Sequence, residues 1–441
     1  METGFPIVML VVPIAAAAVA LVLRRWQRAT AVIGIVTAVL LTLLLWLAAP
    51  EVGLFADNTA NLYGREIVLT PFIRSLFLFI YPAFGTLAAM SWFQSPGRMV
   101  IPAGLAVLAP MAAALMVTPM ATGVVWLVVA ATMLTPALYG GRHNAASPVW
   151  RYILLVTLSV IPLLLTASPP AGGWPIPWLG PLLATLIILG GFPFHIWVGD
   201  LGRHSKPAAL ALALGLAQMV PVIFLLLLLD TVPAARTAVA FQAAVRWSAA
   251  LTAVLAVFQM SRSPDWSSVV AGALLLDMGF LLTAALLPGA DGLIIAVPAL
   301  INRYMSLLLL TFGPGPSSAA VEVSPAQRYI RRLRWFLPAY GLLSLIGLPL
   351  TPGFAARWAQ IVAAGQTPGV WPPVLLMISI LAATWIAARA ISRIKEGYKE
   401  GSDPLSDGEA ILATIMIGVF ILLGLLPHLL TTYAAQMLGI S

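Results

Sequence analysis

The sequence predicts an all-α integral membrane protein that crosses the bilayer about fourteen times. Of its 441 residues, 61% are hydrophobic and only 9% are charged, whereas a soluble domain carries about 25% charged residues. The apolar residues form segments of about 20 residues, the length with which an α-helix crosses the hydrocarbon core. The basic residues gather in alternate connections between these segments, which is typical of membrane proteins.

Fourteen apolar segments reach a length of about 20 residues, and the sequence defines the ends of each segment only to within several residues. The segment 237–260 is the weakest because Arg246 lies inside it. The first segment has no basic stretch before it and is followed by Arg24 and Arg25, so we expect a retained helix rather than a cleaved signal peptide. The segments run over 7–23, 30–49, 72–92, 99–118, 120–139, 150–168, 178–199, 207–229, 237–260, 266–288, 291–312, 335–364, 371–391 and 409–430.

The basic residues also predict the orientation of these spans, because cytoplasmic loops collect Lys and Arg. With the N-terminus outside, most of the 23 basic residues fall in loops that face the cytoplasm: Arg24, Arg25, Arg28, Arg98, Arg142, Arg151, Arg203, Lys206, Arg262, Arg328, Arg331, Arg332, Arg334, Arg389, Arg393, Lys395 and Lys399. We therefore expect an even number of spans, with both termini extracytoplasmic, in a bacterial inner membrane.

Two of the spans are interrupted by residues that open a helix. The seventh span contains Gly190, Gly191 and Pro193, and the twelfth contains Pro349, Pro352 and Gly353. Such a break frees backbone groups, which a membrane tolerates only where protein or a water-filled cavity satisfies them. A broken span therefore indicates a possible transport site. The alternative is that these residues are ordinary Pro-Gly kinks, which are common in transmembrane helices.

The positions of the two breaks predict an internal repeat within a single membrane domain, 1–441. Five spans separate the seventh from the twelfth, and an odd offset puts corresponding spans in opposite orientations. We expect helices 1–3 in 1–98, a first five-helix repeat (helices 4–8) in 99–229, and an inverted second repeat (helices 9–13) in 237–391. Helix 14 follows in 409–430.

Several classes of function are excluded. No cysteine is present, which excludes disulfides, cysteine-ligated iron–sulfur clusters and thiol catalysis. The four histidines lack the spacing of a metal site or of a haem ligand pair. The net charge of +8 is explained by the cytoplasmic loops, and no nucleic-acid-binding motif is visible. We expect no metal, no cofactor and no extramembrane domain in this chain, so any redox or nucleotide chemistry must come from other subunits.

One cytoplasmic connection, Ser317–Arg334, is longer than a turn and contains the basic stretch AQRYIRRLRW. It has the composition of a short amphipathic segment that lies along the membrane surface. A solvated loop is the alternative.

The residues around both breaks resemble a known family. The run from Gly191 to Trp197, followed by Asp200, resembles the PFHxWxPD stretch of the antiporter-like membrane subunits, although Gly199 replaces the usual Pro. The run from Gly347 to Trp358 resembles the GLPPLAGFxxK stretch in the twelfth helix of the same proteins. They occur in respiratory complex I, in Mrp-type cation/proton antiporters and in membrane-bound hydrogenases. The length and the lack of a C-terminal extension are most similar to their N-type subunits in NADH:quinone oxidoreductase.

The resemblance also implies a row of ionisable side chains that moves protons along the middle of the membrane. The expected Glu of the fifth helix falls at Ala131, and the expected Lys residues of the seventh and eighth helices fall at Ile188 and Gln218. The Lys of the twelfth helix falls at Arg357. Arg does not release its proton and Gln carries no charge, so most of the relay is lost. Gln218 remains a proton-path candidate only because its amide can bind a water wire.

Charges that remain inside the spans need partners, because a membrane interior penalises an isolated charge. Asp277 and Arg303 lie on neighbouring antiparallel spans, and each is roughly 14–17 Å from the cytoplasmic end of its span at about 1.5 Å per residue. The sequence therefore predicts a buried ion pair, in which Asp277 is either a gated proton carrier or part of a contact that locks two helices together.

His195 and Arg357 complete the set of proton-path candidates. His195 follows the first break and is either a proton entry group or a neutral side chain that bonds carbonyls freed by the break. Arg357 follows the second break, and we expect it to hold that break or a bound anion, or to act as a counter-charge facing another subunit.

These observations predict a non-catalytic membrane subunit of a complex I-like redox assembly whose proton relay is largely lost. Its expected partners are other membrane subunits, including antiporter-like paralogues and a redox module, together with lipids. One alternative is an active proton or cation channel that uses Asp277 and His195. Another is a membrane subunit of an inorganic-carbon uptake complex or of a hydrogenase. We do not expect a free-standing enzyme, because no nucleophile–base set or cofactor motif is visible.

Overall fold

The computed structural model describes residues 4–48, 58–62, 64–139, 146–169, 176–262, 265–313, 325–366, 369–399 and 405–439. Within these residues, eleven helices are long and apolar enough to cross a membrane by length and composition. Two shorter apolar helices, Val100–Met116 and Leu179–Ile188, accompany them. The predicted integral membrane protein is therefore confirmed, while the count of fourteen spans stays a prediction.

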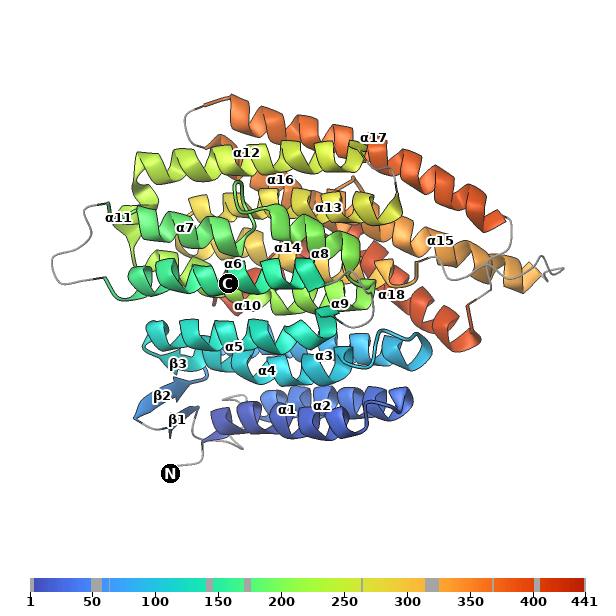
Figure 1. The fold of residues 1–441 in the computed structure, drawn as a ribbon, viewed down its shortest axis with the longest axis horizontal. Coiled ribbons are helices and arrows are strands. Elements are labelled where there is room, and N and C mark those ends of the chain that lie inside the picture. The colour runs from blue at the N-terminus through green and yellow to red at the C-terminus, as the bar shows by residue number, and fades with distance from the viewer. Residues whose placement is uncertain are drawn as a thin grey trace. The chain divides into compact units, whose positions relative to one another are not determined.

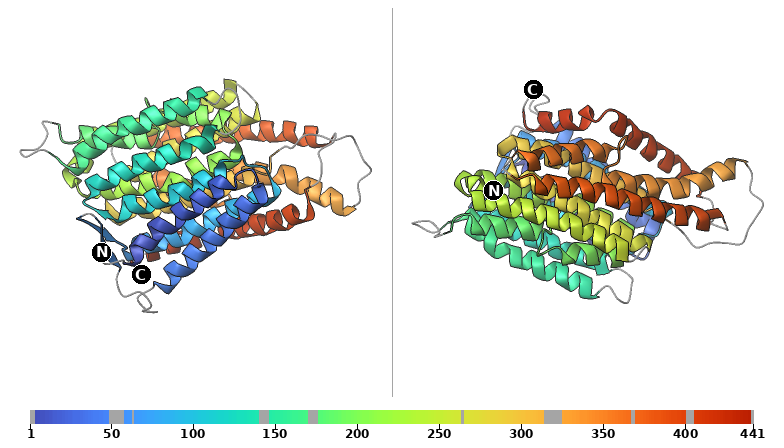
Figure 2. Two further views of the ribbon diagram at one scale, coloured as in Figure 1. Left: turned by 60° about the horizontal axis from the view of Figure 1, so that its bottom comes forward. Right: turned by 90° about the horizontal axis from the view of Figure 1, so that it is seen from above.

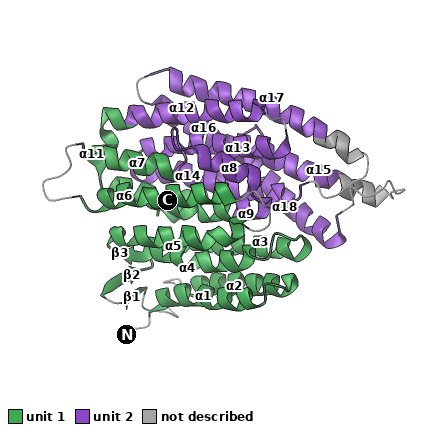
Figure 3. Ribbon diagram, in the orientation of Figure 1, with its two compact units in different colours: residues 1–188, 212–241, 433–441 green, residues 189–211, 242–432 purple. Residues whose placement is uncertain are grey.

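The chain divides into two compact units (Figure 3). Unit 1 comprises Met1–Ile188, Leu212–Phe241 and Tyr433–Ser441, and unit 2 comprises Leu189–Ala211 and Gln242–Thr432. One division between them follows Ile188, directly at the first predicted break. The predicted boundaries of the two repeats stay a prediction.

Unit 1 is built from apolar helices that pack along their lengths, among which α1 and α2 run side by side (Figures 1 and 2). Further contacts join α1 to α4, α2 to α3, and then α4 to α5, α5 to α6 and α6 to α7. The elements are α1 (Phe5–Val22), α2 (Gln27–Leu47), α3 (Pro71–Phe93), α4 (Val100–Met116), α5 (Met120–Tyr139), α6 (Ala146–Ala167), α7 (Leu179–Ile188), the π-helix η1 (Ala211–Ala217), α10 (Met219–Asp230) and α11 (Pro233–Thr237).

A small antiparallel sheet at one end of unit 1 departs from the all-α prediction. It joins β1 (Thr59–Leu62), β2 (Arg65–Val68) and β3 (Val117–Thr118) in that order, and Ala60 pairs with Ile67. Gly64 has a φ of +74° in the turn between β1 and β2, a conformation that glycine adopts without strain. The sequence missed this sheet because strands of two to four residues are too short to show an alternating pattern.

Both ends of the described chain lie near this sheet. A Cβ atom at Gly4 would stand 2.2 Å from the carbonyl oxygen of Thr59 in β1. Near the other end of the chain, the Tyr433 hydroxyl donates a 2.8 Å hydrogen bond to the carbonyl of Ser75, in the first turns of α3. The two ends therefore lie at the same end of unit 1, while the even number of spans stays a prediction. Which side of the membrane this is stays a prediction.

Unit 2 is organised around α13 and α14. All residues of α13 from Ser268 to Leu281 are buried, and α13 contacts α8, α15, α16 and α17. Helix α14 in turn contacts α15, α16 and α18. The elements are α8 (Ile196–His204), α9 (Pro207–Leu210), α12 (Val239–Arg262), α13 (Trp266–Leu281), the 3-10 helix η2 (Leu282–Leu286), α14 (Gly289–Leu310), α15 (Pro325–Ile346), α16 (Pro352–Gly365), α17 (Trp371–Lys399), α18 (Asp407–Leu425) and α19 (His428–Met437), whose last residues belong to unit 1.

The two predicted helix breaks are present. The seventh span consists of α7 and α8, which are separated by residues 189–195, and the twelfth consists of α15 and α16, which are separated by residues 347–351. Where the structure describes this connection it is helical rather than a loop, because α15 already begins at Pro325, and its place on the membrane surface stays a prediction. The basic residues there form its first turns, and Ala, Arg and Gln are strong helix formers. Residues 317–324 of that segment lie outside the described residues.

Candidate functional site

The first break is a sharp turn that only glycine fits. Helix α7 ends at Ile188, and Gly190 has a φ of +57°. A Cβ atom at Gly190 would stand 2.6 Å from Cγ2 of Val198 on α8, so the chain closes tightly on itself here. The turn ends where α8 begins at Ile196.

Neutral side chains satisfy the backbone groups that the first break frees. In unit 1, the Gln218 amide donates a 2.7 Å hydrogen bond to the carbonyl of Ile188. In unit 2, the Phe192 N–H donates to the Thr252 hydroxyl at 2.8 Å, and the Ser248 hydroxyl donates to the Phe192 carbonyl at 2.7 Å. These bonds meet the requirement that no freed backbone group stays unpaired in an apolar interior.

Gln218 follows directly after η1, the π-helix Ala211–Ala217. Its own N–H bonds the carbonyl of Ala213, five residues earlier, at 3.0 Å. A π-helix carries one extra residue in a turn, which rotates the residues after it relative to a regular α-helix, and such segments are frequent at functional sites. Gln218 is 6% exposed. At the place where the family resemblance implies a lysine, the chain therefore has an amide that caps α7.

His195 takes part in neither set of bonds, but its ring interacts with the backbone of Pro193 inside the break. The freed carbonyls of Ile188 and Phe192 are bound by Gln218 and Ser248. His195 is half-buried at the start of α8, its ring stacks on Phe192 with 5.9 Å between centroids, and its Nδ1 has no hydrogen-bond partner in the described part of the chain. A role in proton entry stays a prediction.

The second break is also formed around glycines. Gly347 has a φ of +97°, and a Cβ atom there would stand 2.3 Å from Cγ of Arg357. A Cβ atom at Gly353 would stand 1.9 Å from the carbonyl oxygen of Ser344. Helices α15 and α16 therefore approach more closely than any larger residue at these positions would permit.

An Asn–Ser pair bridges α14 and the second break. The Ser344 hydroxyl donates to Asn302 Oδ1 at 2.6 Å, and Asn302 Nδ2 donates back to the Ser344 carbonyl at 3.2 Å. The Gly353 N–H donates to the Ser344 hydroxyl at 3.4 Å, so the first turn of α16 is bound to the same pair.

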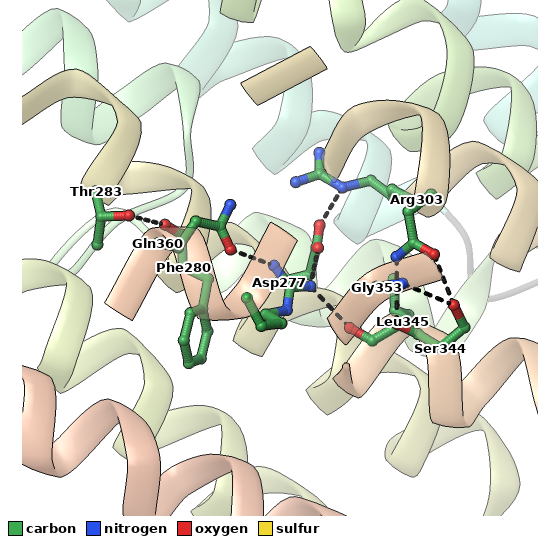
Figure 4. A network of polar contacts seen from close by, with 10 residues as sticks. Asp277, Phe280, Thr283, Arg303, Ser344, Leu345, Gly353 and Gln360 are labelled. Carbon is green, nitrogen blue, oxygen red and sulfur yellow. Dashed lines mark hydrogen bonds and ion pairs between the residues drawn. The ribbon is translucent and has the colours of Figure 1, made fainter. Parts of the chain in front are cut away.

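A buried charge cluster lies beside this break, and Figure 4 shows Asp277 in the middle of it. The carboxylate of Asp277, on α13, forms ion pairs with Arg303 of α14 and with Arg357 of α16. Asp277 and Arg303 are 0% exposed and Arg357 is 1% exposed. Arg357 also donates to the Leu345 carbonyl, freed by the break, and to Gln360 Oε1, both at 2.8 Å.

The predicted pair between Asp277 and Arg303 is therefore present, and Arg357 holds the twelfth-helix break as expected. The expectation that Arg357 faces another subunit is wrong, because its guanidinium is buried against Asp277 and lies 5.1 Å from the ring centroid of Phe280. The break redirects the chain after Gly347, so the depth of Arg357 could not be estimated from a regular helical rise.

The three positions at which the family resemblance implies a charge that this chain lacks lie in unit 1. Ala131 is buried on α5, and Ile188 and Gln218 meet through the hydrogen bond at the end of α7. Asp277 is the only buried carboxylate among the described residues, and no group of three His, Asp or Glu there has a geometry that could hold a metal ion.

Sequence reasoning missed the polar side chains that support both breaks, namely Ser248, Thr252, Asn302, Ser344 and Gln360. For Asn302 a signal was available, since an amide inside an apolar span requires a buried partner. Ser and Thr carry no such signal, because each can bond a carbonyl of its own helix, as Thr252 does with Ser248 at 2.6 Å.

No family model matches the chain. A curated relative, NADH-quinone oxidoreductase subunit N of Thiobacillus denitrificans, is 25% identical over 269 residues. That match covers 57% of this chain and 54% of the relative, so it spans about half the length of the relative.

Solved structures match over nearly the whole chain. A chain of the membrane-bound sulfane sulfur reductase, an archaeal respiratory membrane complex, is 15% identical with a TM-score of 0.75, over 98% of this chain and 97% of that one. A chain of the Mrp complex from Dietzia sp. DQ12-45-1b is 15% identical with a TM-score of 0.73, over 99% and 98%. A chain of respiratory complex I from Thermus thermophilus is 18% identical with a TM-score of 0.72, over 99% of both. The chain therefore shares its fold with these membrane subunits, and part of its sequence is similar to subunit N of NADH-quinone oxidoreductase.

Proposed function

We propose that this chain is an antiporter-like membrane subunit of a complex I-like redox assembly. In this subunit, a buried cluster of fixed charges replaces the row of titratable side chains that the family resemblance implies. The observation that carries the proposal is the Asp277–Arg303–Arg357 cluster, which lies inside a fold that matches subunits of respiratory membrane complexes. In this proposal the subunit contributes to the assembly of the complex and does not move protons along a row of Glu and Lys side chains.

The chemistry of the buried groups supports this assignment. Ala131 and Ile188 have no ionisable group, and the Gln218 amide is engaged by the Ile188 carbonyl. Arginine side chains are fixed charges rather than proton carriers, so Arg303 and Arg357 do not replace the titratable lysines of a relay. Asp277 is held by both of them. A carrier would have to break two buried ion pairs to pick up a proton, which is strongly unfavourable in an apolar interior.

Location and partners follow from the same proposal. The subunit lies in a bacterial inner membrane with both termini outside, beside antiporter-like paralogues and a redox module, with lipids on its apolar faces. Large exposed apolar side chains support lipid or subunit contact, for example Val36 on α2 and Leu381 and Trp385 on α17.

Affinity purification of the native assembly through a tag on this chain, followed by mass spectrometry, tests the proposal. We expect antiporter-like subunits together with redox subunits among the companions. Companions of an inorganic-carbon uptake complex or of a hydrogenase would move the chain to that assembly. Recovery of the intact chain without any redox or transport subunit would contradict the proposal.

A second candidate, a proton channel that uses His195 and Asp277, is favoured by the half-buried His195 ring, whose Nδ1 has no partner among the described residues. Proton flux into proteoliposomes that contain the purified chain distinguishes the two. We expect no flux above that of empty liposomes. A flux that Asp277→Asn abolishes, while Asp291→Asn on the exposed start of α14 leaves it unchanged, would establish the channel instead.

A further inference from the structure

The buried cluster of unit 2 carries more positive than negative charge. Asp277 contributes one negative charge, whereas Arg303 and Arg357 contribute one positive charge each, so the cluster has a net charge of +1. No second buried carboxylate exists in the described ranges to neutralise it. An uncompensated charge in an apolar interior is strongly unfavourable, and such charges are normally paired.

The unused polar atoms around the cluster are almost all hydrogen-bond donors. Arg303 engages Asp277 through Nε, which leaves its Nη1 and Nη2 buried without a partner in the described part of the chain. The same holds for Nε of Arg357 and for Nε2 of Gln360, whose oxygen already accepts from Arg357. The Ser306 hydroxyl, one turn beyond Arg303 on α14, is a further buried group without a partner. A surplus of donors requires an acceptor.

We propose that the Asp277–Arg303–Arg357 cluster binds one small monovalent anion of the size of chloride, held by the terminal guanidinium nitrogens of Arg303 and the amide of Gln360. In the view of Figure 4, the free ends of Arg303 and Gln360 project to the same side of Asp277. One negative charge neutralises the cluster, whereas a divalent anion would leave it with an excess of negative charge.

Burial restricts the anion to a small one. Arg303 and Gln360 are 0% exposed, so a carboxylate on a partner chain cannot reach them across the surface of the protein. The guanidinium group is more weakly hydrated than an ammonium group, which suits it to bind an anion away from water. The bound anion stabilises the contact of α13, α14 and α16 by neutralising the charge that they share.

Two variants make the cluster neutral without an anion, so each is expected to fold. Gln360→Glu adds a carboxylate of nearly the same shape beside Arg357 and supplies the missing negative charge. Arg303→Met removes the surplus positive charge and leaves the pair between Asp277 and Arg357. Arg389→Met, on the exposed face of α17, is the matched control because it removes an arginine that lies over the Trp385 ring outside the cluster.

The experiment measures the thermal midpoint of the purified full-length chain in lipid nanodiscs, in gluconate buffer titrated with sodium chloride at constant ionic strength. A bound ligand stabilises the folded state in proportion to its occupancy. We expect a saturable rise in the midpoint for the wild type and for Arg389→Met. We expect an apparent affinity at least about tenfold weaker, or no rise, for Gln360→Glu and Arg303→Met.

Line broadening of the chloride NMR signal by the protein provides a second readout that does not depend on unfolding. If the wild-type protein gave a saturable response in neither measurement, the anion site would be contradicted. A response that persists unchanged in both cluster variants would overturn it too, because that response would then come from surface charge. The anion site requires only the fold of unit 2, so it is independent of the companion subunits identified by mass spectrometry.

Discussion

The two helix breaks pair their freed backbone groups with different kinds of side chain. Both free backbone groups inside an apolar unit, and both turn on a glycine with positive φ, Gly190 in the first break and Gly347 in the second. The first break is paired by neutral groups, the Gln218 amide and the hydroxyls of Ser248 and Thr252. The second is paired by the Asn302–Ser344 contact and by a charged side chain, Arg357, whose counter-ion is Asp277.

This difference shows that a broken helix can form without a charged side chain beside the break. The first break keeps its geometry although the positions that the family resemblance assigns to lysines are Ile188 and Gln218. A break therefore requires hydrogen-bond partners and does not itself require an ionisable group. The second break carries charge, but that charge is fixed on arginines and neutralised in part by one aspartate.

The largest effect is expected from Asp277→Leu, which removes the one carboxylate that, among the described residues, pairs with the arginine of the second break. Two buried arginines would be left unpaired, and breaking a buried pair costs about 3–5 kcal/mol. We expect loss of the folded protein from the membrane, measured as accumulation and as the thermal midpoint in detergent. Asp291→Leu, at an exposed carboxylate, serves as the control. Near-normal accumulation of Asp277→Leu would show that the second break does not depend on its charges.

A smaller effect is expected from an added methyl group at the two break glycines. Gly347→Ala combines a strained φ of +97° with a clash against Arg357, for about 2–4 kcal/mol. Gly190→Ala meets the Val198 side chain and should cost somewhat less, because that contact is longer. Gly289→Ala is the matched control, with a φ of +53° and open space around it, at about 1 kcal/mol. Thermal midpoints in detergent rank the three, and equal losses would contradict the tight closure of both breaks.

The next smaller loss of stability is expected when a hydroxyl that pairs the first break is removed. Thr252→Val leaves the Phe192 N–H without its acceptor, and an unsatisfied buried group costs about 1–3 kcal/mol. Thr252→Ser keeps the oxygen and should restore most of the stability. The thermal midpoint measures both variants. A Thr252→Val protein as stable as the wild type would mean that the first break does not need this bond.

The smallest effect concerns the start of α13, the helix that carries Asp277. Asp265 Oδ2 accepts from the Ser268 N–H at 3.1 Å and from the Ser267 hydroxyl at 2.6 Å, so Asp265→Ala should cost about 1 kcal/mol. Burial alone would raise the pKa of Asp265, but these hydrogen bonds together lower it. The contribution of the cap is therefore complete above the ordinary pKa of an aspartate and is lost as the pH falls through the lowered value.

Thermal midpoints measured between pH 6 and pH 3 check this cap. The difference between the wild type and Asp265→Ala should shrink toward the acidic end of that range. A difference that stays constant down to pH 3 would argue against a charged cap.

The sequence predicts regular parts of this molecule well and irregular parts poorly. The contact of Asp277 with Arg303 follows from depth alone, because both lie on regular neighbouring helices with a fixed rise per residue. Arg357 lies beyond a break whose direction no periodicity describes, so its place in the cluster was missed. Thr252 and Ser248 were missed for another reason, since a hydroxyl in a helix has partners within its own backbone.

The burial of α13 from Ser268 to Leu281 has a consequence for how the chain enters the membrane. A helix with a central carboxylate is a poor candidate for independent insertion, and so is a helix with a central arginine. Asp277 and Arg303 stand 26 residues apart on consecutive helices, so the two can leave the insertion machinery as a hairpin whose charges are already paired. Arg357 is synthesised later and joins a finished pair. The hairpin of α13 and α14 is therefore neutral when it enters the membrane. The extra positive charge of Arg357 is added only later, when α15 and α16 can enclose it.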